Sequence, residues 1–248
     1  PNRSTLPILS TILIKTTNDK KVVLRATDLE VDLEVLVDSE NLEQGETCCP
    51  THKLFDIVNM ISEETVSINV NEANRMRIKT KTGKYLILCQ KTDEFPETRD
   101  PGESVANIEG KFLHETIKNT IYTCSKDELK PTLNGVLLEI KQNAITAVST
   151  DGHRLVKFVV KQKNKETCKV LIPQKFLNTI AIGTINTQKT NLEIYEDYAF
   201  IKSQNQKLST RLINEKFPDY DNVIPNENPQ KTTTNNQNLL DMVKRVSL

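Results

Sequence analysis

The sequence predicts an α+β protein made of repeated domains, in which antiparallel sheets carry two helices each. Two observations support this prediction: the same motifs recur in the same order along the chain, and most apolar residues alternate with polar ones, as in half-buried strands. A third is that only a few segments have helical periodicity. With 248 residues, the chain has room for roughly two domains, each with its own core.

The internal repeat is the strongest of these signals. Four motifs of the first half return in the second half: ILSTILI (8–14) as TLNGVLL (132–138), RATDLEVDLEV (25–35) as VSTDGHRLVKF (148–158), CPTHKLFDIV (49–58) as IPQKFLNTIA (172–181), and DEFPE (93–97) as EKFPD (215–219). The offsets agree to within about two residues, and a period this long indicates duplicated domains, because solenoid repeats are roughly 20–50 residues long. We expect a first domain over 1–106, lacking its first strand and helix, a second over 107–230, and the start of a third over 231–248.

Most of each copy is predicted to be β-strand. The expected strands are 9–16, 20–27, 29–37, 65–70, 75–80 and 84–89 in the first copy, and 133–140, 144–150, 154–160, 191–196, 198–203 and 207–213 in the second.

The expected helices carry their apolar residues on one face. The predicted stripes are Leu54, Ile57, Val58 and Ile61 on helix 51–61 after Pro50; Phe176, Leu177 and Ile180 on the helix after Pro173; and Leu113, Ile117, Ile121 and Cys124 on helix 112–124. A polar, proline-containing linker over 222–237 then leads to an amphipathic segment, 238–248.

The composition argues against several classes of protein. Basic and acidic residues number 33 each, so no overall charge draws the chain to nucleic acid, although a neutral total can hide a basic face. The five cysteines form no CxxC motif and are expected to be buried thiols in a reducing compartment. The three histidines lack zinc-ligand spacing, and no glycine-rich phosphate motif is present, so neither metal nor cofactor is expected. No membrane-length apolar run or signal peptide is found, and we expect a cytoplasmic protein.

One predicted turn is followed by two polar residues that a plain turn does not require. In STDGHRLV (149–156), Asp151-Gly152 is typical of a tight hairpin turn, yet His153 and Arg154 follow it. The first copy keeps the Thr-Asp pair but lacks Gly-His-Arg, so the fold does not require those three residues. From the residues alone, an ordinary type I′ turn with an exposed flank remains an alternative.

The motifs together resemble a known family. They are STLPILS (4–10), ATDLEV (26–31), EFPE (94–97), SKDELKPTLNGVLLE (125–139), STDGHRL (149–155), LIPQKF (171–176) and STRLINEKFPDYDNVIP (209–225), and they resemble the bacterial DNA polymerase III beta subunit, the beta sliding clamp. The resemblance runs from Arg3 to Leu248. It implies the DNA clamp fold, in which each domain packs two antiparallel sheets against two helices that line the interior of a ring.

The same resemblance implies a function and its partners. A sliding clamp is a non-catalytic, ring-shaped processivity factor that encircles double-stranded DNA. Two subunits of three domains close head to tail into a homodimer ring, which tethers the DNA polymerase III alpha subunit, the clamp loader delta subunit and other proteins with a clamp-binding motif. Relative to the family, this sequence lacks about one strand and one helix before Pro1 and most of a third domain after Leu248.

Two sets of residues carry this function by resemblance. The peptide-binding pocket corresponds to Leu133, Thr150, Gly152, His153, Arg154, Leu155, Pro218, Asn222 and Val223, and it takes a motif that begins with Gln and ends in Leu-Phe. Asn222 departs from the family, where Arg is frequent. The predicted DNA contacts are Arg3, Lys53, Lys118, Lys126, Lys130 and Lys175, although any one of these basic residues is equally typical of a solvated surface.

Two other functions remain as alternatives. Asp151 and His153 could act as an acid–base pair in an enzyme, but no nucleophile, second carboxylate or metal cluster is placed beside them by the sequence. The second alternative is a truncated, clamp-like protein-binding module that recognises a protein through the second copy and does not encircle DNA.

Overall fold

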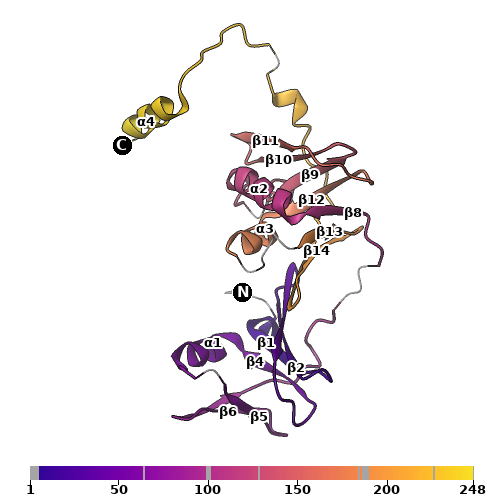
Figure 1. Ribbon diagram of the computed structural model, residues 1–248, viewed down its shortest axis with the longest axis vertical. Helices are drawn as coiled ribbons and strands as arrows, with labels where there is room; N and C mark the ends of the chain where they lie inside the picture. Colours follow the sequence, from indigo (N-terminus) through magenta and orange to yellow (C-terminus); the bar gives the residue numbers. More distant parts are fainter. Residues whose placement is uncertain are drawn as a thin grey trace. The chain divides into compact units, whose positions relative to one another are not determined.

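The computed structural model describes residues 6–63, 65–98, 102–127, 129–183, 185, 190–225 and 227–247. The chain divides into two compact units, Pro1–Lys216 and Phe217–Leu248. The first unit holds the sheets of both copies of the repeat (Figure 1). The domain limits drawn from the repeat stay a prediction.

The strands and helices occur in the predicted order. The strands of the first copy are β1 (Thr11–Thr16), β2 (Lys21–Thr27), β3 (Val31–Asp38), β4 (Glu46–Pro50), β5 (Ser67–Val70), β6 (Arg75–Lys79) and β7 (Lys84–Leu88). Those of the second copy are β8 (Ala106–Glu109), β9 (Gly135–Lys141), β10 (Ala144–Thr150), β11 (Leu155–Val160), β12 (Cys168–Pro173), β13 (Asn191–Ile194), β14 (Tyr198–Lys202) and β15 (Gln206–Arg211). The α-helices are α1 (Thr51–Met60), α2 (Gly110–Thr120), α3 (Gln174–Ala181) and α4 (Asn236–Val246), and short 3-10 helices are η1 (Pro7–Ser10), η2 (Ile121–Thr123), η3 (Pro131–Leu133) and η5 (Asp221–Val223).

Three strands were not predicted, for a physical reason. In β4 and β12 the buried residues are consecutive rather than alternating, and β8 is only four residues long. The period of two that identifies a half-buried strand is therefore absent or too short to see. The predicted helix 112–124 is α2 followed by the 3-10 turn η2, so its last residues are wound more tightly.

The two copies share one sheet. Eight strands pair in the order β4-β1-β2-β3-β15-β14-β13-β8, and the copies join where β15 of the second pairs with β3 of the first, antiparallel, with Ser209 opposite Asp32. Each copy adds a smaller sheet, β5-β6-β7 in the first and β11-β10-β9-β12 in the second. All these pairings are antiparallel, as the alternating sequence patterns predict.

The cores of the two copies differ in how completely they are closed. Helices α2 and α3 of the second copy pack against each other and bury Leu113, Ile117, Phe176, Leu177 and Ile180, as predicted. In the first copy, no residue of α1 is buried. Val58 was predicted on its buried stripe, but it is 54% exposed, so that part of the prediction is wrong.

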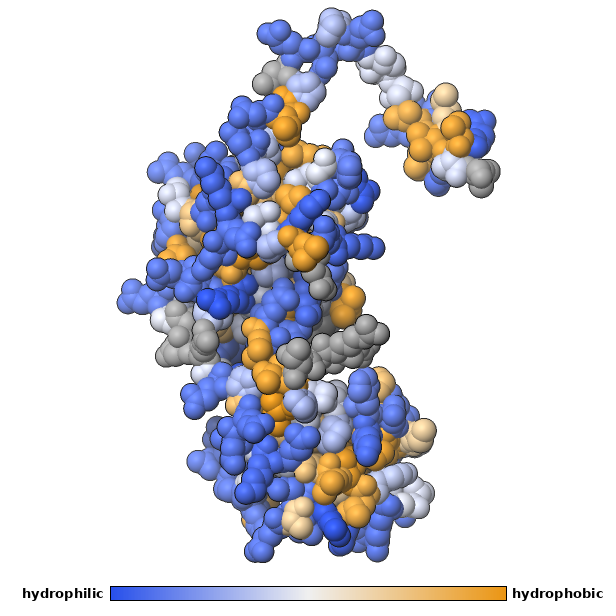
Figure 2. Space-filling view, turned by 180° about the vertical axis from the view of Figure 1, so that it is seen from behind, coloured by the Kyte–Doolittle hydropathy of each residue, from blue (hydrophilic) through white to orange (hydrophobic). Residues whose placement is uncertain are grey.

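The second unit contains η5 and α4. The apolar residues Leu239, Leu240, Met242 and Val243 of α4 are each about half exposed, and Figure 2 shows apolar side chains gathered on this helix. Asn235 caps its N-terminus, since its side-chain oxygen accepts hydrogen bonds from the backbone N–H groups of Gln237 and Asn238. In the described part of the chain, no helix is long and apolar enough to cross a membrane.

Candidate functional site

The segment STDGHRLV contains a four-residue loop. β10 and β11 form the predicted hairpin, with Thr150 opposite Leu155, so residues 151–154 connect them. A type I′ turn has two residues at its tip, both with positive φ, whereas in this loop only Gly152 has a positive φ, of 91°. The two-residue turn is therefore wrong, and His153 and Arg154 belong to the loop itself.

The loop is held by its own Thr-Asp pair. The Thr150 hydroxyl donates to the carbonyl of Arg154 at 2.8 Å and accepts from the N–H of Gly152 at 3.0 Å. One carboxylate oxygen of Asp151 accepts from the N–H groups of His153 and Arg154, both at 3.0 Å. These four bonds set the backbone without using the side chain of any residue after Asp151.

The first copy builds the same loop with different side chains. The Thr27 hydroxyl donates to Val31 and accepts from Leu29, and Asp28 accepts from the backbone N–H groups of Glu30 and Val31. Leu29 stands where the second copy has Gly152, and it has a φ of 75°. The Thr-Asp pair is therefore the structural frame of the loop, and Gly-His-Arg is an addition of the second copy alone.

Arg154 is oriented by two further contacts. Its Nε donates to the second carboxylate oxygen of Asp151 at 3.0 Å, and its Nη2 donates to the carbonyl of Tyr122 at 3.0 Å. The hydrogen bonds from the N–H groups of Arg154 and His153 lower the pKa of Asp151 to about 2, so the carboxylate is ionised at neutral pH. The Arg154 side chain remains 62% exposed, and its guanidinium therefore presents a fixed positive charge to solvent.

Two apolar members of the predicted pocket, Leu133 and Leu155, lie at the same end of this sheet. Leu137 pairs with Val148, so Gly135 at the start of β9 falls opposite Thr150 at the end of β10. Leu133, two residues before Gly135, and Leu155 are both half-buried and belong to this end. The structure thus brings together the six predicted residues of the first unit: Leu133, Thr150, Gly152, His153, Arg154 and Leu155.

The equivalent place in the first copy is closed by an ion pair. Asp32 stands where the second copy has Leu155, and Arg25 stands where it has Val148. The Arg25 Nε lies 3.0 Å from both oxygens of Asp32, and the guanidinium also donates to the carbonyls of Pro96 and Glu97. The second copy has two apolar residues at these positions, so this end of the two domains differs in chemistry.

The remaining predicted pocket residues lie in the second unit. Pro218 and Asn222 are exposed, and the Asn222 amide donates to Asp219 at 2.8 Å. Val223, the last residue of η5, is 68% exposed. Asn222 carries no charge, so beside Asp221 this position of η5 offers an amide.

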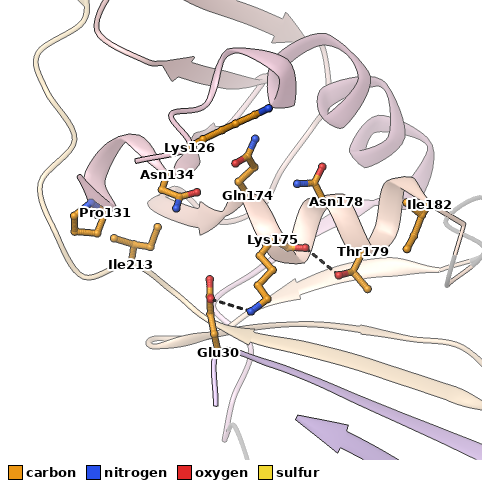
Figure 3. Close-up of a pocket in the computed structure, with 10 residues that line it drawn as sticks. All are labelled: Glu30, Lys126, Pro131, Asn134, Gln174, Lys175, Asn178, Thr179, Ile182 and Ile213. Atoms are coloured by element: carbon orange, nitrogen blue, oxygen red, sulfur yellow. Dashed lines mark hydrogen bonds and ion pairs between the residues drawn. The ribbon is translucent and has the colours of Figure 1, made fainter. Parts of the chain in front are cut away.

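A cavity of about 780 Å³ lies beside two of the predicted DNA contacts (Figure 3). It is lined by Glu30, Lys126, Pro131, Asn134, Gln174, Lys175, Asn178, Thr179, Ile182 and Ile213. Lys126 and Lys175 were predicted from the sequence, whereas the amides of Asn134, Gln174 and Asn178 were not. No sequence pattern singles out these amides, because they converge only in the folded chain, where the N–H of Gln174 donates to the carbonyl of Asn134 at 3.0 Å.

Lys175 is also part of an ion cluster between the two copies. Its ammonium contacts the carboxylate of Asp28 and lies 3.7 Å from that of Glu30, both in the first copy's loop. Burial is the largest influence and would raise the pKa of Asp28, but the hydrogen bond and charge of Lys175, together with the backbone N–H groups of Val31 and Glu30, outweigh it and hold that pKa below its usual value. Two carboxylates therefore compete with any phosphate for Lys175.

The other predicted DNA contacts are spread over several elements. Lys118 is exposed in the last turn of α2, and Lys53 is exposed in the first turn of α1. The ammonium nitrogen of Lys130 lies 3.9 Å from a carboxylate oxygen of Asp127. Arg3 lies outside the described residues. No group of three or more His, Cys, Asp or Glu that could hold a metal ion occurs among the residues the structure describes.

Comparisons with known proteins agree with this architecture. The family description "DNA polymerase III beta subunit, N-terminal domain" matches residues 1–99, and "DNA polymerase III beta subunit, central domain" matches residues 107–219. The beta sliding clamp of Pseudomonas putida is 28% identical over 99% of this chain and 68% of its own length.

Solved structures agree as well. The DNA polymerase sliding clamp of Bacillus subtilis shares the fold, with a TM-score of 0.89 at 24% identity over 100% of this chain and 68% of its own. The DNA polymerase III subunit beta of Pseudomonas aeruginosa has a TM-score of 0.81 at 26% identity over 90% of this chain and 62% of its own. The duplicated domains joined through one sheet define the fold of a DNA sliding clamp. The chain belongs to the DNA polymerase III beta subunit family, and its function is that of a DNA sliding clamp.

Proposed function

We propose that this clamp encircles double-stranded DNA as a closed homodimer ring and tethers its partners through a peptide pocket on the second copy. The partners are the DNA polymerase III alpha subunit, the clamp loader delta subunit and other proteins with a clamp-binding motif. The clamp has no catalytic activity of its own, and it acts in the cytoplasm, where the DNA is.

The main support for the proposed pocket is the difference between the two copies of this loop. Both copies use the same Thr-Asp frame, so the loop does not require a glycine at 152 or the side chains of His153 and Arg154, and these can serve a ligand. Apart from its two chain neighbours, no residue that the structure describes has an atom within 4 Å of the position that a Cβ on Gly152 would take, which leaves this place open to an incoming peptide. In the first copy, Arg25 and Asp32 fill the equivalent place with an ion pair.

The chemistry of the pocket suits a short peptide with apolar and polar ends. Leu133 and Leu155 supply apolar area for the Leu and Phe anchors of the motif. Arg154 is held in place before binding by Asp151 and by the Tyr122 carbonyl, so little side-chain entropy is lost when it meets a peptide carboxylate or carbonyl.

Contacts with DNA follow from different residues. A sliding ring needs weak contacts that ignore sequence, and lysines that reach phosphates supply them. Lys126 and the amides around the cavity are the best-supported set, since Lys126 has no ion pair with any residue that the structure describes. Lys118 and Lys53 are exposed and add to the set, whereas Lys175 is partly neutralised by Asp28 and Glu30.

A fluorescence-anisotropy titration tests the pocket. A labelled peptide with Gln first and Leu-Phe last is titrated with the chain and with the variants Arg154→Ala and Leu155→Ala. We expect a dissociation constant near the micromolar level, or roughly −8 kcal/mol, and a weaker complex for both variants. Val159→Ala is the matched control, because Val159 is an exposed residue of the same strand but lies near the end remote from the loop.

Three results would decide between the proposals. Binding that both pocket variants lose and the control keeps supports the pocket. Equal binding by all variants would refute it. Peptide binding by a chain that never forms a DNA-encircling dimer, measured by its mass in solution with a circular duplex, would favour the protein-binding module.

A further inference from the structure

Two of the cysteines face each other across a pair of strands in the first copy. The N–H of Cys48 donates to the carbonyl of Gln90 at 3.0 Å, and the N–H of Gln90 donates to the carbonyl of Cys48 at 2.8 Å. Residues that exchange two hydrogen bonds in this way form one antiparallel pair, so the next pair along the strands is Cys49 opposite Cys89. This next pair has no mutual backbone bonds, and such pairs bring the Cα atoms to about 4.5 Å, within the range that a disulfide spans.

The two thiols lie in the same core. Cys49 is 0% exposed and Cys89 is 5% exposed, and both belong to the cluster with Met76, Ile78 and Ile87. The Cys49 thiol donates to the carbonyl of Pro50 at 3.9 Å and the Cys89 thiol to that of Ile87 at 4.0 Å. The influence of each sulfur on the other raises the pKa of Cys49 and lowers that of Cys89 to about 7. The neighbouring Cys48 points to the other side of the strand, where it packs with Ile8, Leu9 and Phe95.

The second copy shows that packing does not require thiols here. The same pair of backbone strands recurs, with the N–H of Ile213 donating to the carbonyl of Leu171 at 2.9 Å. The positions of Cys49 and Cys89 are then taken by Ile172 and Leu212, both buried and apolar. The fold thus needs only two apolar side chains at this place, and the first copy supplies two facing sulfur atoms instead.

We propose that Cys49 and Cys89 form a reversible disulfide when the clamp meets an oxidant of the peroxide class. The thiolate of Cys89 attacks hydrogen peroxide, the O–O bond breaks, and a sulfenic acid and water result once the leaving hydroxide takes up a proton. The sulfur of Cys49 then attacks the sulfenic sulfur, the S–S bond forms, and the second oxygen leaves as water. In total the two thiols lose two electrons and two protons to peroxide, and a dithiol reductant reverses the change.

The disulfide would join β4 to the residue that follows β7. Because α1 begins two residues after Cys49, the bond would also fix the strand end from which this helix starts. The disulfide would add most stability to the core of the first copy, because this core contains few buried helix residues. The thiols are buried, so oxidation depends on brief local opening and is expected to accelerate in mild urea.

The test is a count and a map of thiols in the reduced chain before and after treatment with hydrogen peroxide, in buffer and in mild urea. We expect two of the five cysteines to become resistant to alkylation and the intact mass to fall by about 2 Da, because one disulfide removes two hydrogen atoms. A non-reducing digest should contain a peptide in which Cys49 is linked to Cys89. The oxidised chain should unfold at a higher urea concentration than the reduced chain, since the closed loop restricts the unfolded state.

Variants that introduce the residues of the second copy make the result decisive. Cys49→Ile and Cys89→Leu keep an apolar core, should fold, and should lose both the cross-link and the shift in urea midpoint. Cys168→Ser removes a half-buried thiol elsewhere and should keep both. Retention of all five thiols in mild urea, a cross-link through Cys48, or an unchanged cross-link in Cys89→Leu would each overturn the proposal.

Discussion

The ion pair in the first copy allows a quantitative prediction. Arg25 is almost wholly buried, with a side chain 6% exposed, and Asp32 is 23% exposed. Three contacts join the guanidinium to the carboxylate, of which the shortest is 2.6 Å, and two more reach the carbonyls of Pro96 and Glu97. The centre of the Phe95 ring also lies 5.5 Å from the guanidinium carbon.

Replacing Arg25 by Val leaves the carboxylate of Asp32 and two carbonyls without these partners. Breaking a buried pair by removing one member costs about 3–5 kcal/mol, and we expect the lower end because Asp32 retains some solvent. The double change Arg25→Val with Asp32→Leu installs the residues of the second copy. It should recover most of the loss, because replacing both charges by apolar groups is often neutral.

Urea denaturation of the unchanged protein, the two single variants and the double variant forms a double-mutant cycle. The free energy of unfolding of each protein is taken from the midpoint and slope of its transition. The expected coupling between positions 25 and 32 is about 2 kcal/mol or more. If Arg25→Val costs less than about 1 kcal/mol and the cycle closes additively, the conclusion that this buried ion pair stabilises the fold is refuted.

Three further predictions follow from single sites. Asp151 has a folded pKa of about 2, below the ordinary value of 3.8, so its contribution to stability is complete above about pH 4 and is lost as the pH falls towards 2. Asp151→Asn should make the urea midpoint depend less on pH over that range. An unchanged dependence of the midpoint on pH would contradict this prediction. A Cβ on Gly135 would lie 2.7 Å from the carbonyl oxygen of Ile172, so Gly135→Ala should cost about 1–3 kcal/mol by urea denaturation, whereas Gly45→Ala, with open space around it, should be tolerated. Lys126→Ala should lower the dependence of DNA affinity on salt, with a slope of log K against log salt smaller by about 0.9 in a binding titration, and an unchanged slope would remove Lys126 from the interface.

Several elements of the fold were predictable because they depend on local pattern. The hairpin β10–β11 and the buried faces of α2 and α3 follow from periods of two and 3.6, which a single sequence displays. The strands β4 and β12 were missed because each is covered on both faces near its end, where the alternation disappears. Val58 was misplaced because helical period shows which residues share a face, but not how far the core extends beneath it.

Part of the candidate site was also predictable from the sequence, and part of it was not. Gly152, His153 and Arg154 could be found from the repeat, since one copy has them and the other does not. The contact of Arg154 with the Tyr122 carbonyl could not be found, because it joins a loop to a 3-10 turn that is distant in sequence. The same holds for Lys175, whose carboxylate partners lie in the other copy.

The sequence by itself determined the duplication, the strand-rich class of the fold and the loop that distinguishes the second copy, because each is written in spacing and residue type along the chain. Only the tertiary structure decided that the loop has four residues, that Arg25 and Asp32 close the equivalent place in the first copy, and that Cys49 meets Cys89. These facts depend on which strands pair and in what register, and register is set by the packing of whole sheets against one another rather than by neighbours in sequence.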